Sequence, residues 1–79
     1  MITIEYMANV GLGDTKPSQI IKKTSGDGNF EILTCNQFVG WRDNPAAMKH
    51  FILPDGAESI DPKKAEAIVE EWSKNWPED

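Results

Sequence analysis

Hydrophobic and polar residues alternate at the start of the chain. In the opening stretch MITIEYM, the side chains of Ile2, Ile4 and Tyr6 are separated by polar ones, and a period of two residues is typical of a strand with one buried face. The next stretch, NVGLGDTKP, contains two glycines and a proline, which interrupt regular structure. The pattern therefore predicts a strand over residues 1–7, followed by a loop.

The stretch IIKKTSGDGNFEILTC predicts a β-hairpin. Two β-rich runs flank the sequence Ser-Gly-Asp-Gly-Asn, in which the glycines supply positive φ angles without a side-chain penalty. An alternative is a short helix over residues 17–24 that Asp14 or Thr15 caps and a glycine ends. We favour the strand, because Ile20 and Ile21 are β-branched and so short a helix is difficult to sustain.

Two further apolar runs, FVGW and MKHFIL, are separated by RDNPAA. The pair Asn44-Pro45 marks a turn, or else Pro45 occupies the first position of one or two helical turns. The motif PDG at residues 54–56 ends the second run. We interpret both runs as strands, which gives four or five short antiparallel strands in all.

The last third of the chain has a helical period. Asp61 is suited to the N-cap position and Pro62 to the first helical position. Five apolar residues then follow at steps of 3, 1, 3 and 4 and form one stripe: Ala65, Ile68, Val69, Trp72 and Trp76. Off this stripe, Glu70 and Lys74 have the i,i+4 spacing of a favourable ion pair.

Together these patterns predict the α+β fold class, with one small domain over residues 1–79. In this fold a small antiparallel sheet of four to five short strands packs against one C-terminal amphipathic helix. A core of this size rarely supplies more than about 3–5 kcal/mol of stability, so a partner chain is a common supplement. The lone Cys35 cannot form a disulfide within the chain and fits a reducing, cytoplasmic setting. The N-terminus lacks a basic leader and a long apolar run, which again favours the cytoplasm and no membrane contact.

The net charge of −5 is concentrated in one part of the chain. Residues 1–54 carry five acids and five bases, whereas residues 55–79 carry eight acids and three lysines. Because phosphate binding needs a basic stripe, this distribution argues against direct binding to nucleic acid. It favours a larger protein partner with a basic surface.

Two stretches resemble binding loops but lack the necessary spacing. GLGDTK at residues 11–16 has neither the spacing nor the order of a phosphate-binding loop. DGNFE begins like a calcium loop, but Ile32 stands at the sixth position, where glycine is needed, and Phe38 stands at the twelfth, where glutamate is needed. We interpret the first as a surface loop and the second as a hairpin turn, and we expect no cofactor.

Other candidate chemistry also has a structural interpretation. Cys35 and His50 are the candidates for a thiol nucleophile with a base. We expect instead that both lie in strands, with Cys35 buried and His50 pointing at solvent or at a neighbour that satisfies it. Asp55, Glu58 and Asp61 are acids in a polar connection, where Asp61 is already explained as a cap. We therefore expect no catalytic residue and no metal site.

The chain has three tryptophans, a residue type enriched both in small cores and at binding hot spots. Trp72 lies in the middle of the helical stripe and is expected in the core. Trp76 precedes Pro77, which disfavours the helical conformation at Trp76, so it either caps the core or stands partly exposed at an interface. Trp41, between an apolar run and a turn, has the same two interpretations.

These observations predict a small acidic, non-enzymatic protein-binding domain that acts as an inhibitor or regulator. Many small single-domain proteins, phage-encoded ones included, act by occupying a partner's site. The predicted contact residues are Trp76, Glu70, Glu71, Glu78, Asp79 and Trp41. The main alternative is a homodimer or larger assembly formed through an exposed edge strand or the tryptophan face. A nucleic-acid mimic and a small enzyme built on Cys35 and His50 are weaker alternatives.

Overall fold

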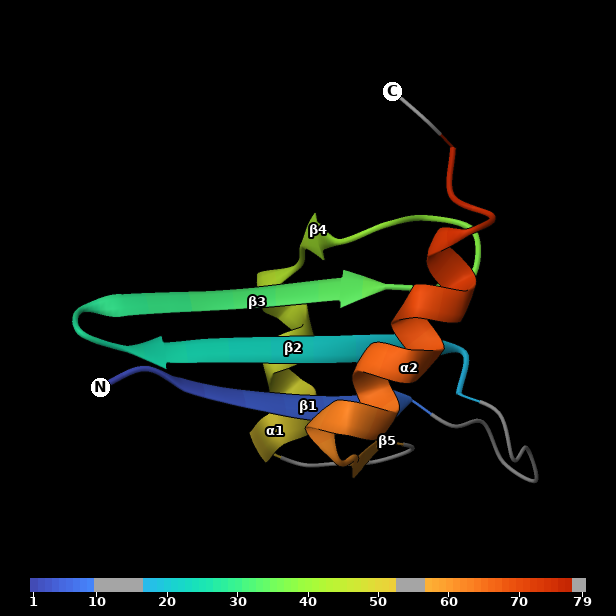
Figure 1. Cartoon of the computed structure of the whole chain (residues 1–79). Coiled ribbons are helices and arrows are strands. Elements are labelled where there is room, and N and C mark those ends of the chain that lie inside the picture. Colours follow the sequence, from blue (N-terminus) through green and yellow to red (C-terminus); the bar gives the residue numbers. More distant parts are fainter. Residues whose placement is uncertain (10–16, 53–56, 78–79) are drawn as a thin grey trace.

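The computed structural model describes residues 1–9, 17–52 and 57–77. Within these residues, five antiparallel strands form one sheet (Figure 1): β1 (Thr3–Asn9), β2 (Gln19–Gly26), β3 (Asn29–Cys35), β4 (Arg42–Asp43) and β5 (Ala57–Ser59). Their order across the sheet is β4-β3-β2-β1-β5. The helices are the 3-10 helix η1 (Pro45–Met48), α1 (Lys49–Ile52) and α2 (Pro62–Ser73). The predicted α+β class, the antiparallel sheet of four to five short strands and the C-terminal helix are confirmed.

The predicted hairpin is formed by β2 and β3. Gly26 pairs with Asn29 across a two-residue turn, in which Asp27 and Gly28 have φ angles of 50° and 79°. Positive φ at both central residues defines the type I′ turn, whose twist matches that of the flanking strands. The strand interpretation of the segment after Pro17 is therefore confirmed, with β2 beginning at Gln19.

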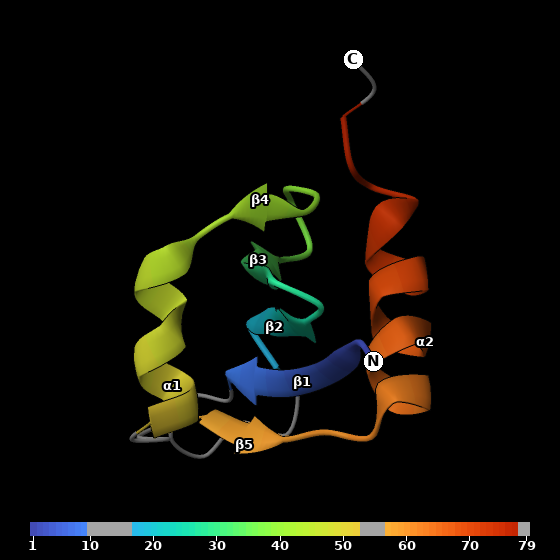
Figure 2. The same cartoon turned by 90° about the vertical axis from the view of Figure 1, so that its left-hand side faces the viewer.

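The sheet is covered on both faces, with α2 on one side and η1 with α1 on the other (Figure 2). Side chains alternate in direction along a strand, so the neighbours Ile20 and Ile21 enter different clusters. The α2-side core contains Tyr6, Ala8, Ile20, Cys35 and Ala65. The α1-side core contains Met7, Ile21, Ile32, Ala47 and Ala57. The fold thus has a second helical layer, in addition to the predicted one.

The interpretation of FVGW and MKHFIL as strands is wrong. Residues 38–41 form no strand, and β4 follows them with two residues. Residues 48–52 are helical in η1 and α1, while Leu53 lies outside the described residues. The reason is the spacing of Ala47, Met48 and Phe51, which pack together on the α1-side core as one face of a helix. Pro45 begins this helix, as the alternative at Asn44-Pro45 allowed.

Helix α2 confirms most of the C-terminal prediction. Pro62 is its first residue, and Ala65 is fully buried against the sheet. Asp61 holds the N-cap position, but its side chain makes no capping hydrogen bond. The remaining apolar residues of the stripe pack partly buried on the α2-side core: Ile68, Val69, Trp72 and Trp76. None of the described helices is long and apolar enough to cross a membrane.

Candidate protein-binding site

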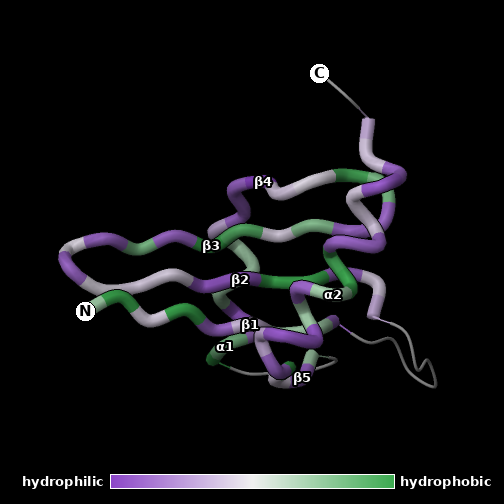
Figure 3. The backbone as a smooth tube through the Cα atoms, in the orientation of Figure 1, coloured by the Kyte–Doolittle hydropathy of each residue, from purple (hydrophilic) through white to green (hydrophobic). Residues whose placement is uncertain are grey.

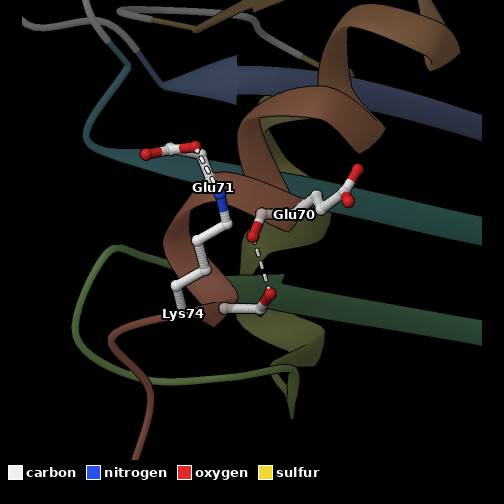
Figure 4. Close-up of polar contacts among 4 residues, drawn as sticks. Glu70, Glu71 and Lys74 are labelled. Carbon is white, nitrogen blue, oxygen red and sulfur yellow. Dashed lines mark hydrogen bonds and ion pairs between the residues drawn. The ribbon is translucent and has the colours of Figure 1, made fainter.

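The predicted contact residues occupy different kinds of position. Glu70 and Glu71 are exposed on α2, and Figure 4 shows their carboxylates pointing in different directions around the helix. Lys74 pairs with Glu71, at 3.3 Å between Nζ and Oε2, and not with Glu70 as predicted. On a helix, a lysine can reach a carboxylate at either i,i+3 or i,i+4 spacing, and here Lys74 pairs with its i,i+3 neighbour Glu71. Glu78 and Asp79 lie outside the described residues.

Trp76 is half-buried and fixes the end of α2 to the loop after β3. Its indole Nε1 donates a hydrogen bond to the backbone oxygen of Asn36 at 2.7 Å. Its ring lies so close to Gly40 that a Cβ at that position would be 3.2 Å from Cε3 of the indole. Within the same loop the Asn36 carboxamide oxygen accepts hydrogen bonds from the backbone N–H groups of Phe38 and Val39. Trp76 thus has a structural role in this molecule.

Trp41 lines a depression of about 220 Å³ between α2 and the sheet. The other lining residues are Tyr6, Lys22, Glu66, Val69 and Glu70. Of the predicted contact residues, the fold brings Trp41 and Glu70 together here. Glu71 and Trp76 do not line it. We refer to these six residues as the Trp41 depression.

The secondary structure explains how the depression is assembled. Tyr6 and Lys22 are cross-strand partners in β1 and β2, so their side chains stand side by side on one face of the sheet. Glu66, Val69 and Glu70 have i, i+3 and i+4 spacing, which places them on one side of α2. The half-buried ring of Trp41, just before β4, packs against the α2-side core.

The electrostatics of the depression favour a cation over the indole ring. The Lys22 ammonium lies 5.7 Å from the centroid of the Trp41 ring, within the range of cation–π attraction. Burial and the nearby Glu66 carboxylate both raise the pKa of the Tyr6 hydroxyl. The phenol therefore stays protonated at neutral pH. The depression offers a positive ligand two carboxylates, an aromatic face and a neutral hydroxyl.

The residues considered for thiol chemistry do not come together. Cys35 belongs to the α2-side core, whereas His50 lies on α1 at the opposite face of the sheet. Burial raises the pKa of the Cys35 thiol to about 11, which leaves it protonated and unreactive at neutral pH. The buried position predicted for Cys35 is confirmed, but His50 is a helical residue and not the predicted strand residue.

The acids before α2 are only partly described. Glu58 lies in β5 and Asp61 at the start of α2, while Asp55 is outside the described ranges. Among the described residues, no three His, Cys, Asp or Glu side chains are grouped closely enough to hold a metal ion. The stretch GLGDTK, predicted as a loop, also lies outside the described residues.

Four residues of the depression were absent from the predicted site: Tyr6, Lys22, Glu66 and Val69. One signal was present for Glu66, because its i,i+4 spacing from Glu70 places both carboxylates on one side of a helix. The pairing of Tyr6 with Lys22 depends on the register between two strands separated by a loop, which no local pattern specifies.

Comparisons of this chain with protein families, with curated proteins and with solved structures find no match.

Proposed function

We propose that the protein is a small non-enzymatic binding domain, of the inhibitor or regulator kind, that docks on a basic surface of a larger protein. The contact surface is the Trp41 depression, to which α2 contributes the carboxylates of Glu66 and Glu70. The observation that supports this proposal is the meeting of the Trp41 ring with the carboxylates of Glu66 and Glu70 in one depression. A cytoplasmic setting is part of the proposal, because Cys35 is a free thiol.

An arginine side chain of the partner suits this chemistry best. A guanidinium group is planar, stacks on aromatic rings and donates several hydrogen bonds to carboxylates in a fixed geometry. Such a group could stack on Trp41 while it donates to Glu66 or Glu70. Lys22 already lies over the ring, so the partner's cation has to compete with it or displace it.

Glu66 and Glu70 are more available than Glu71. The ion pairs in the described part of the chain join Met1 with Asp27, Lys23 with Glu5 and Lys74 with Glu71. Neither Glu66 nor Glu70 has such a partner there, and both are exposed. We therefore assign the main electrostatic contribution to these two residues. Trp76 supports the site by holding the end of α2.

Nucleic-acid mimicry is less well supported than protein docking. From Pro62 to Lys74 the chain carries three glutamates and three lysines, so this stretch has no net charge. Duplex DNA presents a negative charge about every 1.7 Å of its axis without interruption by positive charges. The surface of α2 is a mixed-sign surface, which suits a specific protein contact.

The first test is affinity capture from a lysate of the source cell, washed at low and then at high salt. The bait is the wild-type protein or the double variant Glu66→Gln/Glu70→Gln. A partner held by the wild type at low salt should be lost at high salt, because exposed charge pairs are screened. The double variant should fail to hold it even at low salt.

The matched control is Glu31→Gln/Glu58→Gln. It makes the same change in net charge, at two exposed carboxylates that do not line the Trp41 depression. The control should retain the partner. Equal loss with both double variants would mean that net charge alone drives capture, and capture by the Glu66→Gln/Glu70→Gln protein would contradict the proposed site.

A second test needs no partner. Nα-acetylarginine amide should shift the indole N–H resonance of Trp41 in a nuclear magnetic resonance titration, whereas the neutral analogue Nα-acetylcitrulline amide should not. The two probes have nearly the same shape, so a difference reports on charge. Equal shifts with both probes would contradict recognition of a guanidinium group.

A further inference from the structure

In the part of the chain that the structure describes, the outer edge of β1 is only partly covered. β5 pairs with β1 from Met7 to Asn9, and the N–H of Ile60 donates to the carbonyl oxygen of Tyr6 at 3.2 Å. Before Tyr6, no strand in residues 1–9, 17–52 or 57–77 pairs with this edge. In Figure 1, β1 continues past β5 toward the turn between β2 and β3.

The uncovered edge presents backbone groups that can pair. The N–H and C=O groups of successive residues in a strand point alternately to its two sides. Because the Tyr6 carbonyl points toward β5, the backbone groups of Ile4, in the same strand, point to that side, and those of Ile2 would do so in a β1 extended by pairing. Natural proteins usually protect such an edge with lysine, proline or a bulge, and the stretch Ile2–Ile4 contains none of these.

Apolar side chains gather at this edge. Met1, Ile2 and Ile4 are 99%, 52% and 45% exposed, and Figure 3 shows hydrophobic positions alternating along the start of β1. Beside Ile4 and Glu5 lies a depression of about 210 Å³ that Phe51, Ile60 and Pro62 also line. We refer to it as the edge notch. It opens beyond the end of β5, where a longer strand would continue.

We propose that the protein forms a symmetric dimer in which the β1 edges of two copies pair antiparallel, with Thr3 on the two-fold axis. In this register Ile2 of each copy pairs with Ile4 of the other, and the two sheets become continuous. This inference is independent of the proposed binding site.

A second copy fits this edge because the segment is self-complementary. The register uses the outward backbone groups of Ile2 and Ile4 and does not need those of Tyr6, which Ile60 already engages. The four isoleucines of the two copies lie on one face, where their exposed surfaces are buried together. Met1 of the second copy is then opposite Glu5, beside the edge notch. There the exposed side chain of Met1 can pack against apolar residues that line the notch.

The charges also allow two copies to meet. Glu5 is the one charged side chain between Ile2 and Tyr6, and its carboxylate lies 2.6 Å from the Lys23 ammonium of the same chain. With Thr3 on the axis, no carboxylate faces the same carboxylate of the other copy. A two-fold interface brings each axial residue against itself, so an uncharged residue at that position is required.

The first experiment is cysteine cross-linking. Thr3 faces Thr3 of the other copy as a non-hydrogen-bonded pair, with Cα atoms about 4.5 Å apart, a distance that a disulfide can span. The Thr3→Cys variant should therefore convert to a disulfide-linked dimer in oxidised glutathione, as two thiols form one disulfide and glutathione is reduced. The matched control is Phe30→Cys, at an exposed residue of β3, across β2 from β1.

Phe30→Cys should give only the mixed disulfide with glutathione, since Phe30 lies away from the proposed axis. The buried Cys35 takes no part in either variant. Dimer formation by Thr3→Cys that is no greater than that by Phe30→Cys would overturn the proposal.

Sedimentation equilibrium gives an independent measurement. The wild type should sediment as a dimer. The dissociation constant of the dimer should rise at least about tenfold in Ile4→Lys, because a lysine on an edge strand opposes pairing with a second strand. Ile2→Lys lies before β1 and should weaken the dimer while the far-ultraviolet circular dichroism spectrum stays native. Phe30→Lys should leave the dimer intact. A monomeric wild type, or equal loss in Phe30→Lys, would overturn the proposal.

Discussion

The indole N–H of Trp76 donates a 2.7 Å hydrogen bond to the backbone oxygen of Asn36, which joins positions 40 residues apart in the chain. The loop that contains Asn36 also leads to Trp41. One side chain thus connects the end of α2 with the loop beside the proposed binding site.

Two replacements of Trp76 should distinguish the contribution of its hydrogen bond to stability from the contribution of its ring packing. Trp76→Phe keeps an aromatic ring but removes the N–H donor, and should lower the free energy of unfolding by about 1 kcal/mol. Trp76→Ala also removes the half-buried ring and should cost about 2 kcal/mol. Urea denaturation followed by circular dichroism measures both. An unchanged midpoint for Trp76→Phe would show that the hydrogen bond does not stabilise the fold.

Two glycines of the hairpin should respond differently to alanine. Gly28 has a φ of +79° and open space where a Cβ would stand, so Gly28→Ala should cost about 1 kcal/mol from backbone strain alone. Gly26 has a φ of +128°, and a Cβ there would collide with the carbonyl oxygen of Met1. Gly26→Ala should therefore lower the thermal midpoint clearly more than Gly28→Ala does, and equal shifts would contradict this description of the N-terminus.

The two faces of the sheet should contribute comparably to stability. Ile20 and Ile21 are both fully buried, one in each core. Ile20→Val and Ile21→Val should each cost about 1 kcal/mol in denaturant unfolding, since each removes one buried methylene group. If the helical layer of η1 and α1 did not cover its face, Ile21→Val would be nearly neutral.

Stability should fall at alkaline pH through Cys35. Burial raises the pKa of this thiol from 9.0 to about 11, so between these values the unfolded chain loses a proton that the native chain keeps. Under that condition the free energy of unfolding decreases as pH rises, by at most about 1.4 kcal/mol per pH unit. Its contribution is thus fully present below pH 9 and is lost toward pH 11. Chemical denaturation at pH 8 and pH 10 should show this decrease in the wild type and a smaller one in Cys35→Ala. Equal decreases would assign the effect to other groups, such as Tyr6, whose pKa burial also raises.

Lys22 should limit the affinity of the proposed binding site. Its ammonium lies over Trp41 in the same depression as Glu66 and Glu70, where it competes with a cation of the partner. Lys22→Gln should tighten binding of a captured basic partner about threefold, chiefly through slower dissociation. Surface plasmon resonance measures this, with Lys49→Gln, at an exposed lysine of α1, as the control of equal charge. Weaker binding by Lys22→Gln would mean that Lys22 orients the Trp41 ring for the partner.

Local chemistry allowed much of the fold to be predicted. The alternation in β1, the Asp27-Gly28 turn and the apolar stripe of α2 each specify one element with little reference to the rest of the chain. The apolar run MKHFIL does not specify its own secondary structure, because a run this short has no period that distinguishes a strand from a helix. The α1-side core decided between them, since Ala47, Met48 and Phe51 reach it together only from a helix.

Some features of the candidate site and of the β1 edge follow from local sequence, and others depend on the tertiary structure. The sequence by itself determined the acidic character of the last third of the chain and the side-by-side position of Glu66 and Glu70 on a helix. It also determined that Ile2 and Ile4 alternate with polar residues at the start of the chain. Only the tertiary structure decided that Trp41 meets Glu70, that Trp76 packs on Gly40, and that β5 ends before it reaches Ile4. Periodicity and turn chemistry act between neighbours in the chain, whereas these three relationships depend on strand register and on how α2 lies across the sheet.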